Sequence, residues 1–321
     1  MRRFISFAAK AAISGLLLYL AFDFVNLATL RERLGQIAFG WVAAGIAALA
    51  LPVFLVSIRW RMIGQACGAA VGHKRTLLYT LIGMFFNQTL PSTVGGDAAR
   101  MWLLARHTGK WKSSVHSVII DRAAGLIWLM LLVLLCLPWS LDMIREPVGR
   151  LALMLIGAGG VAVLIVLYLL AHPGGAFLLR WRPTRYVAEL AAATCSAILT
   201  VRVGAMIAGM SLLVHVLAAL SAWCFAKSVG SALDVPQALF LLPPVILISA
   251  IPISIAGWGL REGAMVAAFA YAGLPEGDGF IVSLLIGVSQ FLIGAAGGLV
   301  WITSSDRERI GPIDSAAPPV G

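Results

Sequence analysis

Long stretches without a charged residue recur along the chain, at 34–58, 123–141, 151–171, 203–226, 235–260 and 279–305. Each contains the roughly 18–20 apolar residues that an α-helix needs to cross a bilayer. A further apolar stretch begins close to the first residue and is interrupted by Lys10. The pattern predicts six spanning helices, at about 4–27, 40–58, 115–138, 151–171, 203–227 and 279–302.

Two other apolar segments, 76–105 and 236–273, are interrupted by proline and glycine near their centres. The interruptions read TLPSTVGGD in the first segment and AIPISIAGWGLREG in the second. Backbone groups that lose their helical partners at membrane depth are tolerated only where they are buried in protein or line a wet cavity. We therefore expect two re-entrant helical hairpins, each of which enters and leaves the membrane on the same side.

The centres of these segments align without a gap, LPSTVGGDAAR at 90–100 with IPISIAGWGLR at 251–261. Three identities in eleven positions also arise by chance in an apolar chain, but the spacing from proline to arginine is the same in both. Paired interruptions in the two halves of a membrane protein point to a transporter binding site. The identical pairs are Pro91 with Pro252, Gly96 with Gly257, and Arg100 with Arg261.

These patterns predict an all-α integral membrane protein with about six transmembrane helices and two re-entrant hairpins in an inverted repeat. Of its 321 residues, 60% are hydrophobic and only 12% are charged, about half the charged fraction of a soluble domain. We expect one membrane domain at 1–305, with inverted halves at about 1–140 and 150–303. The remainder, 306–321, is rich in proline, glycine and alanine and is expected to be a disordered cytoplasmic tail.

The positions of the basic residues predict the orientation. With the N-terminus inside, the segments 59–75, 106–112 and 172–202 fall on the inner side and carry most of the arginines and lysines outside the spans. Such a bias marks the cytoplasmic side, so the formal net charge of +10 does not require nucleic acid as a partner. We predict a multi-pass protein of a bacterial inner membrane with both termini in the cytoplasm. Its first helix is expected to be retained and not cleaved as a signal peptide.

Charged residues follow the break in the first interrupted segment. Gly95 and Gly96 can end one half-helix and open the next, and we expect Asp97 to cap the second half-helix. Backbone N–H groups and the helix dipole favour an anion at such a start. Arg100, one turn further on, adds a two-pronged donor for phosphate. An equally weighted alternative is that Asp97 and Arg100, three residues apart, pair with each other and fix the hairpin.

The second interrupted segment offers equivalent residues in Gly257 and Arg261. We therefore expect Arg100 and Arg261 to form a shared site for a lipid headgroup. Glu262 follows Arg261 directly, and because neighbours on a helix point about 100° apart, we do not expect these two to pair. Glu262 is instead interpreted as a counter-ion of Arg100 or as a proton-coupling carboxylate, with a structural role slightly favoured.

Two adjacent charges, Asp121 and Arg122, lie inside the apolar stretch of the next span. A charge at the bilayer centre costs about 2.5–3.5 kcal/mol, so both residues need partners. We expect Arg100 and Glu262 to be those partners, with extension of both side chains to the inner interface as the alternative. Arg59, at the end of an apolar stretch, is interpreted as an interfacial anchor.

Motifs for enzymatic chemistry are missing from the sequence. The four cysteines stand singly in apolar surroundings, which argues against a disulfide or a metal site. The sequence contains no GxSxG, no HExxH and no Walker loop. We expect no cofactor and no metal, and an enzyme is the less favoured class.

Four stretches carry a family resemblance. RWRMI at 59–63, FFNQTLPSTVGGDAARMWLLAR at 85–106, DRAAG at 121–125 and PISIAGWGLREGAMVAAF at 252–269 resemble the flippase-like membrane module of lysylphosphatidylglycerol synthases. The resemblance covers nearly the whole chain. It implies a stand-alone module without the aminoacyl-transfer domain that follows this part in the synthases.

The resemblance also implies a function in lipid handling, and the predicted partners are membrane lipids with an anionic or phosphate-bearing headgroup. The leading hypothesis is a flippase that moves a phospholipid or a modified polar lipid between leaflets. One alternative is a membrane-embedded lipid-modifying enzyme in which Asp97, Asp121 or Glu262 acts as acid or base. A second is a non-catalytic membrane partner of a separate lipid-synthesis enzyme, and a homo-oligomer remains open.

Overall fold

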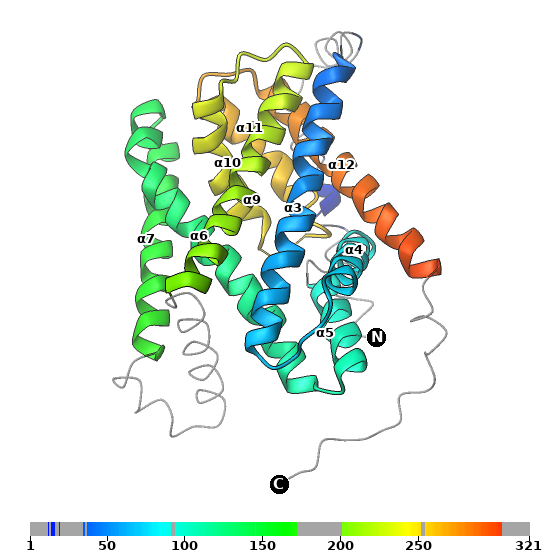
Figure 1. Cartoon of the computed structure of the whole chain (residues 1–321). Coiled ribbons are helices and arrows are strands. Elements are labelled where there is room, and N and C mark those ends of the chain that lie inside the picture. Colours follow the sequence, from blue (N-terminus) through cyan, green and yellow to red (C-terminus); the bar gives the residue numbers. More distant parts are fainter. Residues whose placement is uncertain are drawn as a thin grey trace.

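The computed structural model of the chain is helical at most of the positions that it describes (Figure 1). It describes residues 37–90, 94–144, 146–171, 201–251 and 254–303, together with isolated positions in the first 35 residues. Most of the predicted span at 4–27, the basic stretch 172–200 and the predicted tail lie outside the described residues, as do Pro91 and Pro252. The helices are α3 (Phe39–Ala66), α4 (His73–Thr89), α5 (Gly95–Thr108), α6 (Trp111–Met143), α7 (Pro147–Ala171), α9 (Val201–Ser228), α10 (Val235–Ser249), α11 (Leu260–Tyr271) and α12 (Glu276–Thr303).

Five described helices are long and apolar enough to cross a membrane, namely α3, α6, α7, α9 and α12. At about 1.5 Å per residue, the 28 residues of α3 extend roughly 42 Å, which exceeds the roughly 30 Å of a hydrocarbon core. These helices confirm the all-α membrane fold and five of the six predicted spans. Two of them extend well past the predicted bounds, α3 to Ala66 and α6 back to Trp111.

The two interrupted segments form pairs of shorter helices, as predicted. The first pair, α4 and α5, has 17 and 14 residues, and the second pair, α10 and α11, has 15 and 12. At about 1.5 Å per residue none of them exceeds roughly 26 Å, so each is too short to cross a hydrocarbon core of about 30 Å alone. The helices of the first pair are separated by 90–94 and those of the second pair by 250–259.

Glycines allow close contact between the two arms of the first hairpin. A Cβ atom on Gly96 would overlap the carbonyl oxygen of Gly83, and the Gly96 N–H donates to Asn87 Oδ1 at 2.8 Å. Gly83 also lies against the side chain of Arg100. Residue numbers thus rise along one arm as they fall along the other, which makes α4 and α5 antiparallel.

The hairpins open toward opposite ends of the molecule (Figure 1). The connections of α4–α5 to α3 and α6 lie at the lower end of the view, and those of α10–α11 to α9 and α12 lie at the upper end. The two hairpins contact the same two long helices. In the first hairpin α4 packs on α12 and α5 packs on α6, and in the second α11 packs on α12 and α10 packs on α6. Both hairpins are therefore held between the long helices α6 and α12.

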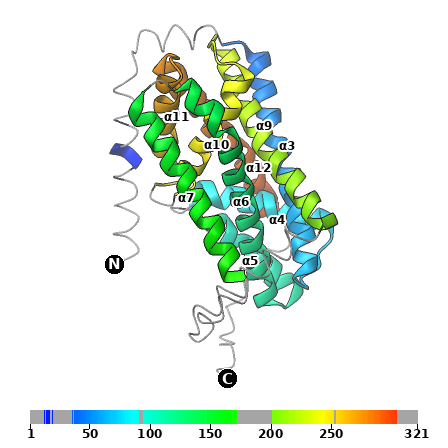
Figure 2. The ribbon, with the colours of Figure 1, turned by 90° about the vertical axis from the view of Figure 1, so that its left-hand side faces the viewer.

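Helix α7 stands at the left-hand edge of the bundle in Figure 1 and therefore lies in front of it in Figure 2. It packs mainly on α6, and much of its surface is exposed and apolar, as at Leu151, Leu155 and Ile165. An apolar surface of this kind is stable against lipid. The buried interior lies instead among the other helices, where Phe225, Met265 and Phe269 are fully covered.

Candidate functional site

A cavity of about 470 Å³ lies between the two hairpins. Side chains from α3, α4, α5, α6, α9, α10, α11 and α12 line it. The first hairpin reaches it through Asn87 near the end of α4, and the second reaches it through Gly257 in its turn. Its wall is mostly apolar, with Leu49 and Val53 on α3 and Leu129 on α6. The cavity thus combines an apolar wall with the second of the two backbone breaks that the sequence predicts.

The second break has a backbone that explains its glycines. Gly257 and Gly259 have φ angles of 81° and 85°, in the left-handed region, where glycine has no steric penalty. Ala256, the residue before Gly257, also has a positive φ of 50°. The turn brings Ala256 and Gly257 to the cavity wall and directs the start of α11 toward it.

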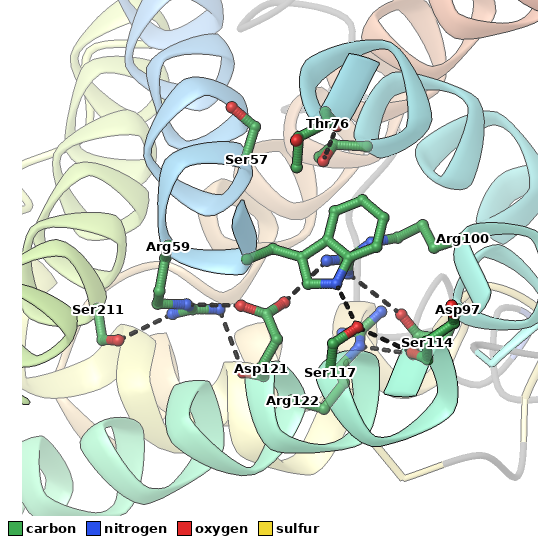
Figure 3. Close-up of polar contacts among 12 residues, drawn as sticks. Ser57, Arg59, Thr76, Asp97, Arg100, Ser114, Ser117, Asp121, Arg122 and Ser211 are labelled. Carbon is green, nitrogen blue, oxygen red and sulfur yellow. Dashed lines mark hydrogen bonds and ion pairs between the residues drawn. The ribbon is translucent and has the colours of Figure 1, made fainter. Parts of the chain in front are cut away.

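Five charged side chains from three parts of the sequence form a largely buried ionic cluster on this wall (Figure 3). Asp121 lies at its centre, where Oδ1 accepts from Arg59 Nε at 2.8 Å and Oδ2 accepts from Arg100 Nη2 at 3.0 Å. Asp97 binds the other terminal nitrogen of Arg100, because its Oδ1 accepts from Arg100 Nη1 at 3.5 Å. Asp97 Oδ2 accepts from Arg122 Nε at 2.6 Å. Three guanidinium groups and two carboxylates give the cluster a formal charge of +1.

Neighbouring helices hold the ionic cluster in place. Arg59 Nη1 donates to Ser211 Oγ on α9 at 2.8 Å. The guanidinium of Arg100 lies over the ring of Trp60 at 4.0 Å from its centre, a geometry that attracts a cation to the face of an indole. The ring is fixed in turn because Trp60 Nε1 donates to Ser117 Oγ at 3.2 Å. The cluster therefore links α3, α5, α6 and α9.

A second charged group lies at the start of α11. Arg261 Nη2 donates to Glu262 Oε1 at 2.7 Å, and Arg261 Nη1 donates to Gln290 Oε1 at 3.0 Å. Ser283 Oγ donates to the same carboxylate oxygen at 3.0 Å and accepts from Arg261 Nε at 3.1 Å. The other carboxylate oxygen of Glu262 accepts from the Gly259 N–H at 2.6 Å. One cation and one anion make this group formally neutral.

Three expectations about partners are wrong. Arg261 and Glu262 do pair, because the long arginine side chain folds back and the Gly259 N–H draws the carboxylate toward the helix start. Arg100 forms ion pairs with Asp97 and Asp121 and not with Glu262. Glu262 is likewise no partner of Arg122, which binds Asp97, whereas the expected pair of Asp121 with Arg100 is present.

Two expectations about position also need correction. Asp97 does not cap α5, because that helix begins at Gly95, its N-cap is Val94, and the first-turn N–H of Gly96 is bound by Asn87. Arg59 is not an interfacial anchor but a buried member of the ionic cluster, since α3 continues past it to Ala66. The pairing of Asp97 with Arg100 in the first hairpin, one of the two alternatives, is present at 3.5 Å.

The predicted site residues differ in whether they reach the cavity. Arg100, Arg261 and Gly257 line it, together with Asp97, Asp121 and Arg122, whereas Gly95, Gly96 and Glu262 do not. Gly95 and Gly96 are buried at the start of α5. Sequence reasoning did not assign Asn87, Ser211 and Gln290 to the site. The sequence does contain a signal for Asn87. It is a polar residue three positions before Leu90, where the break begins, in a segment that is otherwise apolar enough to span a membrane.

No group of three or more His, Cys, Asp or Glu side chains suited to a metal ion occurs within the described ranges. The carboxylates of the site are already engaged with arginine, serine or backbone donors. What the arrangement offers chemically is excess positive charge next to an apolar space. An anion attached to an apolar chain matches both features.

The fold and the site together define an all-α, multi-pass membrane protein with paired half-helices around an internal charged cavity. Residues 7–298 match the family described as the lysylphosphatidylglycerol synthase TM region, and the chain belongs to this family. Among curated proteins no relative matches the chain. The family ties the chain to membranes and to lipid modification.

Proposed function

We propose that the protein moves a phospholipid or another polar lipid with an anionic headgroup between the leaflets of a bacterial inner membrane. The headgroup would enter the central cavity while the acyl chains remain in lipid. The observation that carries this proposal is the excess charge of the ionic cluster beside a largely apolar cavity of about 470 Å³.

The arrangement of the hairpins supports transport. They open toward opposite ends of the molecule. The first contacts the cavity through the end of α4 and the start of α5, and the second contacts it at its turn. We interpret them as the halves of an inverted repeat, in which each half can open the cavity to one side of the membrane. No described segment resembles a nucleotide site, so the gradient of the lipid or of an ion would drive net movement.

The enzyme alternative has less support. A general acid or base must reach the substrate and exchange a proton with it. Asp121 is held by two arginines, and Glu262 accepts from an arginine, a serine and a backbone N–H. Proton transfer by either carboxylate would require these bonds to break first.

Leaflet exchange can be measured in reconstituted vesicles that carry a fluorescently labelled anionic phospholipid, with a membrane-impermeant quencher added outside. Arg100→Ala combined with Arg261→Ala should slow exchange about a hundredfold or more, since charge-assisted hydrogen bonds contribute about 1.5–3 kcal/mol each and about 1.4 kcal/mol corresponds to a factor of ten. Arg100→Lys should have a smaller effect, because lysine keeps the charge and loses the planar fork.

Arg106→Ala is the matched control, because Arg106 is an exposed arginine of α5 that does not line the cavity. It should exchange lipid at the wild-type rate. Wild-type exchange in the double alanine variant, with normal expression and reconstitution, would rule out a headgroup site at these arginines and leave the charges with a structural role alone.

A further inference from the structure

Arg122 differs from the other two arginines of the ionic cluster in how much of it is covered. The side chains of Arg59 and Arg100 are each only 6% exposed, whereas that of Arg122 is 49% exposed. Arg122 nevertheless belongs to α6, twelve residues into that helix, and it lines the cavity. Its open surface therefore faces the cavity and adjoining open space.

The hydrogen bonds of Arg122 leave one edge of its guanidinium group open. Nε donates to Asp97 Oδ2 at 2.6 Å, and Nη1 and Nη2 have no partner within the described residues. Arg59, by contrast, uses Nε, Nη1 and Nη2, and Arg100 uses both of its Nη atoms. Arg261 likewise uses all three nitrogens. Among the arginines of the cavity, Arg122 is thus the one with both terminal nitrogens available.

Two parallel N–H groups at the end of a guanidinium match two oxygens of a phosphate. The ionic cluster supplies a formal charge of +1, which one phosphodiester anion would neutralise. The group around Arg261 and Glu262 is neutral and offers no such charge. We therefore expect the anion to bind next to the ionic cluster and not midway between it and the group at Arg261 and Glu262.

We propose that the terminal nitrogens of Arg122 bind the phosphate oxygens of the ligand, while Arg59 and Arg100 position the cluster. The proposal rests on the function proposed above and assigns the direct contact to a residue that the sequence suggests only for charge compensation. Asp97 acts as an internal competitor, because its carboxylate attracts the same guanidinium. It holds the Nε edge and leaves the opposite edge to the ligand.

Binding can be measured apart from transport by the shift in thermal unfolding of the whole protein in an uncharged detergent. The probes are a short-chain phosphatidylglycerol, inorganic phosphate and an uncharged alkyl glucoside. Arg122→Gln should weaken binding of the phospholipid about tenfold or more, and Arg122→Lys should weaken it less. Asp97→Asn should strengthen binding severalfold, because it removes the competing charge.

Arg106→Gln is the control and should bind as the wild type does. Unchanged binding in both Arg122 variants would overturn the proposal, and so would weaker binding in Asp97→Asn when that variant unfolds at the wild-type temperature. If Arg122→Gln does not fold, Arg122→Lys and Asp97→Asn still decide the question. Saturation by inorganic phosphate at the same concentration as the phospholipid would identify free phosphate as the ligand, whereas a need for the acyl chains would identify a lipid headgroup.

The same variants separate this proposal from the proposed function. Binding that depends on Arg122 without any leaflet exchange in the wild type would support the anion site and exclude lipid transport under the assay conditions. Wild-type exchange that persists in Arg122→Gln, together with unchanged binding, would overturn the Arg122 site and leave lipid transport standing.

Discussion

Asp121 bridges two arginines that belong to different helices. Arg59 comes from α3 and Arg100 from α5, and each binds a different oxygen of the same carboxylate. Removing one member of a buried ionic network leaves uncompensated charge and typically costs about 3–5 kcal/mol. The loss should be large here, because Asp121 is a close partner of both arginines.

Asp121→Asn should therefore lower the free energy of unfolding by about 3–5 kcal/mol. Thermal unfolding of the purified protein in detergent measures the change. Asp142→Asn is the matched control, because Asp142 is an exposed aspartate near the other end of α6. Equal unfolding temperatures for the two variants would show that the network around Asp121 adds no net stability.

At the residue scale the sequence identifies which charges need partners but not which partners they find. Asp121 and Arg122 stand out because they interrupt an apolar stretch. Arg59 does not, since it ends such a stretch and resembles an interfacial residue. The 100° between neighbouring residues on a helix does not predict the pairing of Arg261 with Glu262. The arginine side chain has enough rotatable bonds to reach its neighbour in spite of that angle.

At the scale of elements, α12 is the surface on which both hairpins rest. In its first half, Gly279 and Gly287 lie against α11, and in its second half Gly297 and Gly298 lie against α4. A Cβ atom on Gly297 would overlap the carbonyl oxygen of Leu81. Small residues of this kind let membrane helices approach closely enough for backbone contact.

Gly297→Val should separate α12 from α4 and destabilise the fold by about 1–3 kcal/mol, as overpacking does elsewhere. Gly209→Ala in α9 is the control, because a Cβ atom there meets nothing within 4 Å, and alanine favours a helix over glycine by about 1 kcal/mol. Size-exclusion chromatography after stepwise heating compares the two. A Gly297→Val protein as heat-resistant as Gly209→Ala would contradict the close contact.

The sequence predicts these elements well because proline and glycine mark the breaks directly. The hairpins predicted at 76–105 and 236–273 agree within three residues at each end with the observed helix pairs α4–α5 (73–108) and α10–α11 (235–271). Helix ends are less predictable, as the extensions of α3 and α6 show. Hydropathy reports where a helix meets lipid, whereas the helix itself continues until capping or a turn ends it.

For the whole molecule, the orientation in the membrane remains a prediction from charge. The α5–α6 connection at Lys110 and the α9–α10 connection at Ala232 lie at opposite ends of the bundle. In a background without native cysteines, Lys110→Cys should resist a membrane-impermeant thiol reagent added to intact cells, and Ala232→Cys should react. Both residues are exposed, so each should react once the cells are opened. The reverse pattern in intact cells would invert the predicted topology.

The unequal charge of the two groups in the cavity has an electrical consequence. A net elementary charge that moves across a membrane responds to the potential by about 2.3 kcal/mol per 100 mV. The empty ionic cluster has a formal charge of +1, and a monovalent anionic headgroup would cancel it. Any step that carries the cluster through the field should then depend on voltage when the cavity is empty and be nearly independent of voltage when it is loaded. A diffusion potential imposed on the reconstituted vesicles would act on the return of the empty protein and leave the passage of the lipid itself almost unchanged.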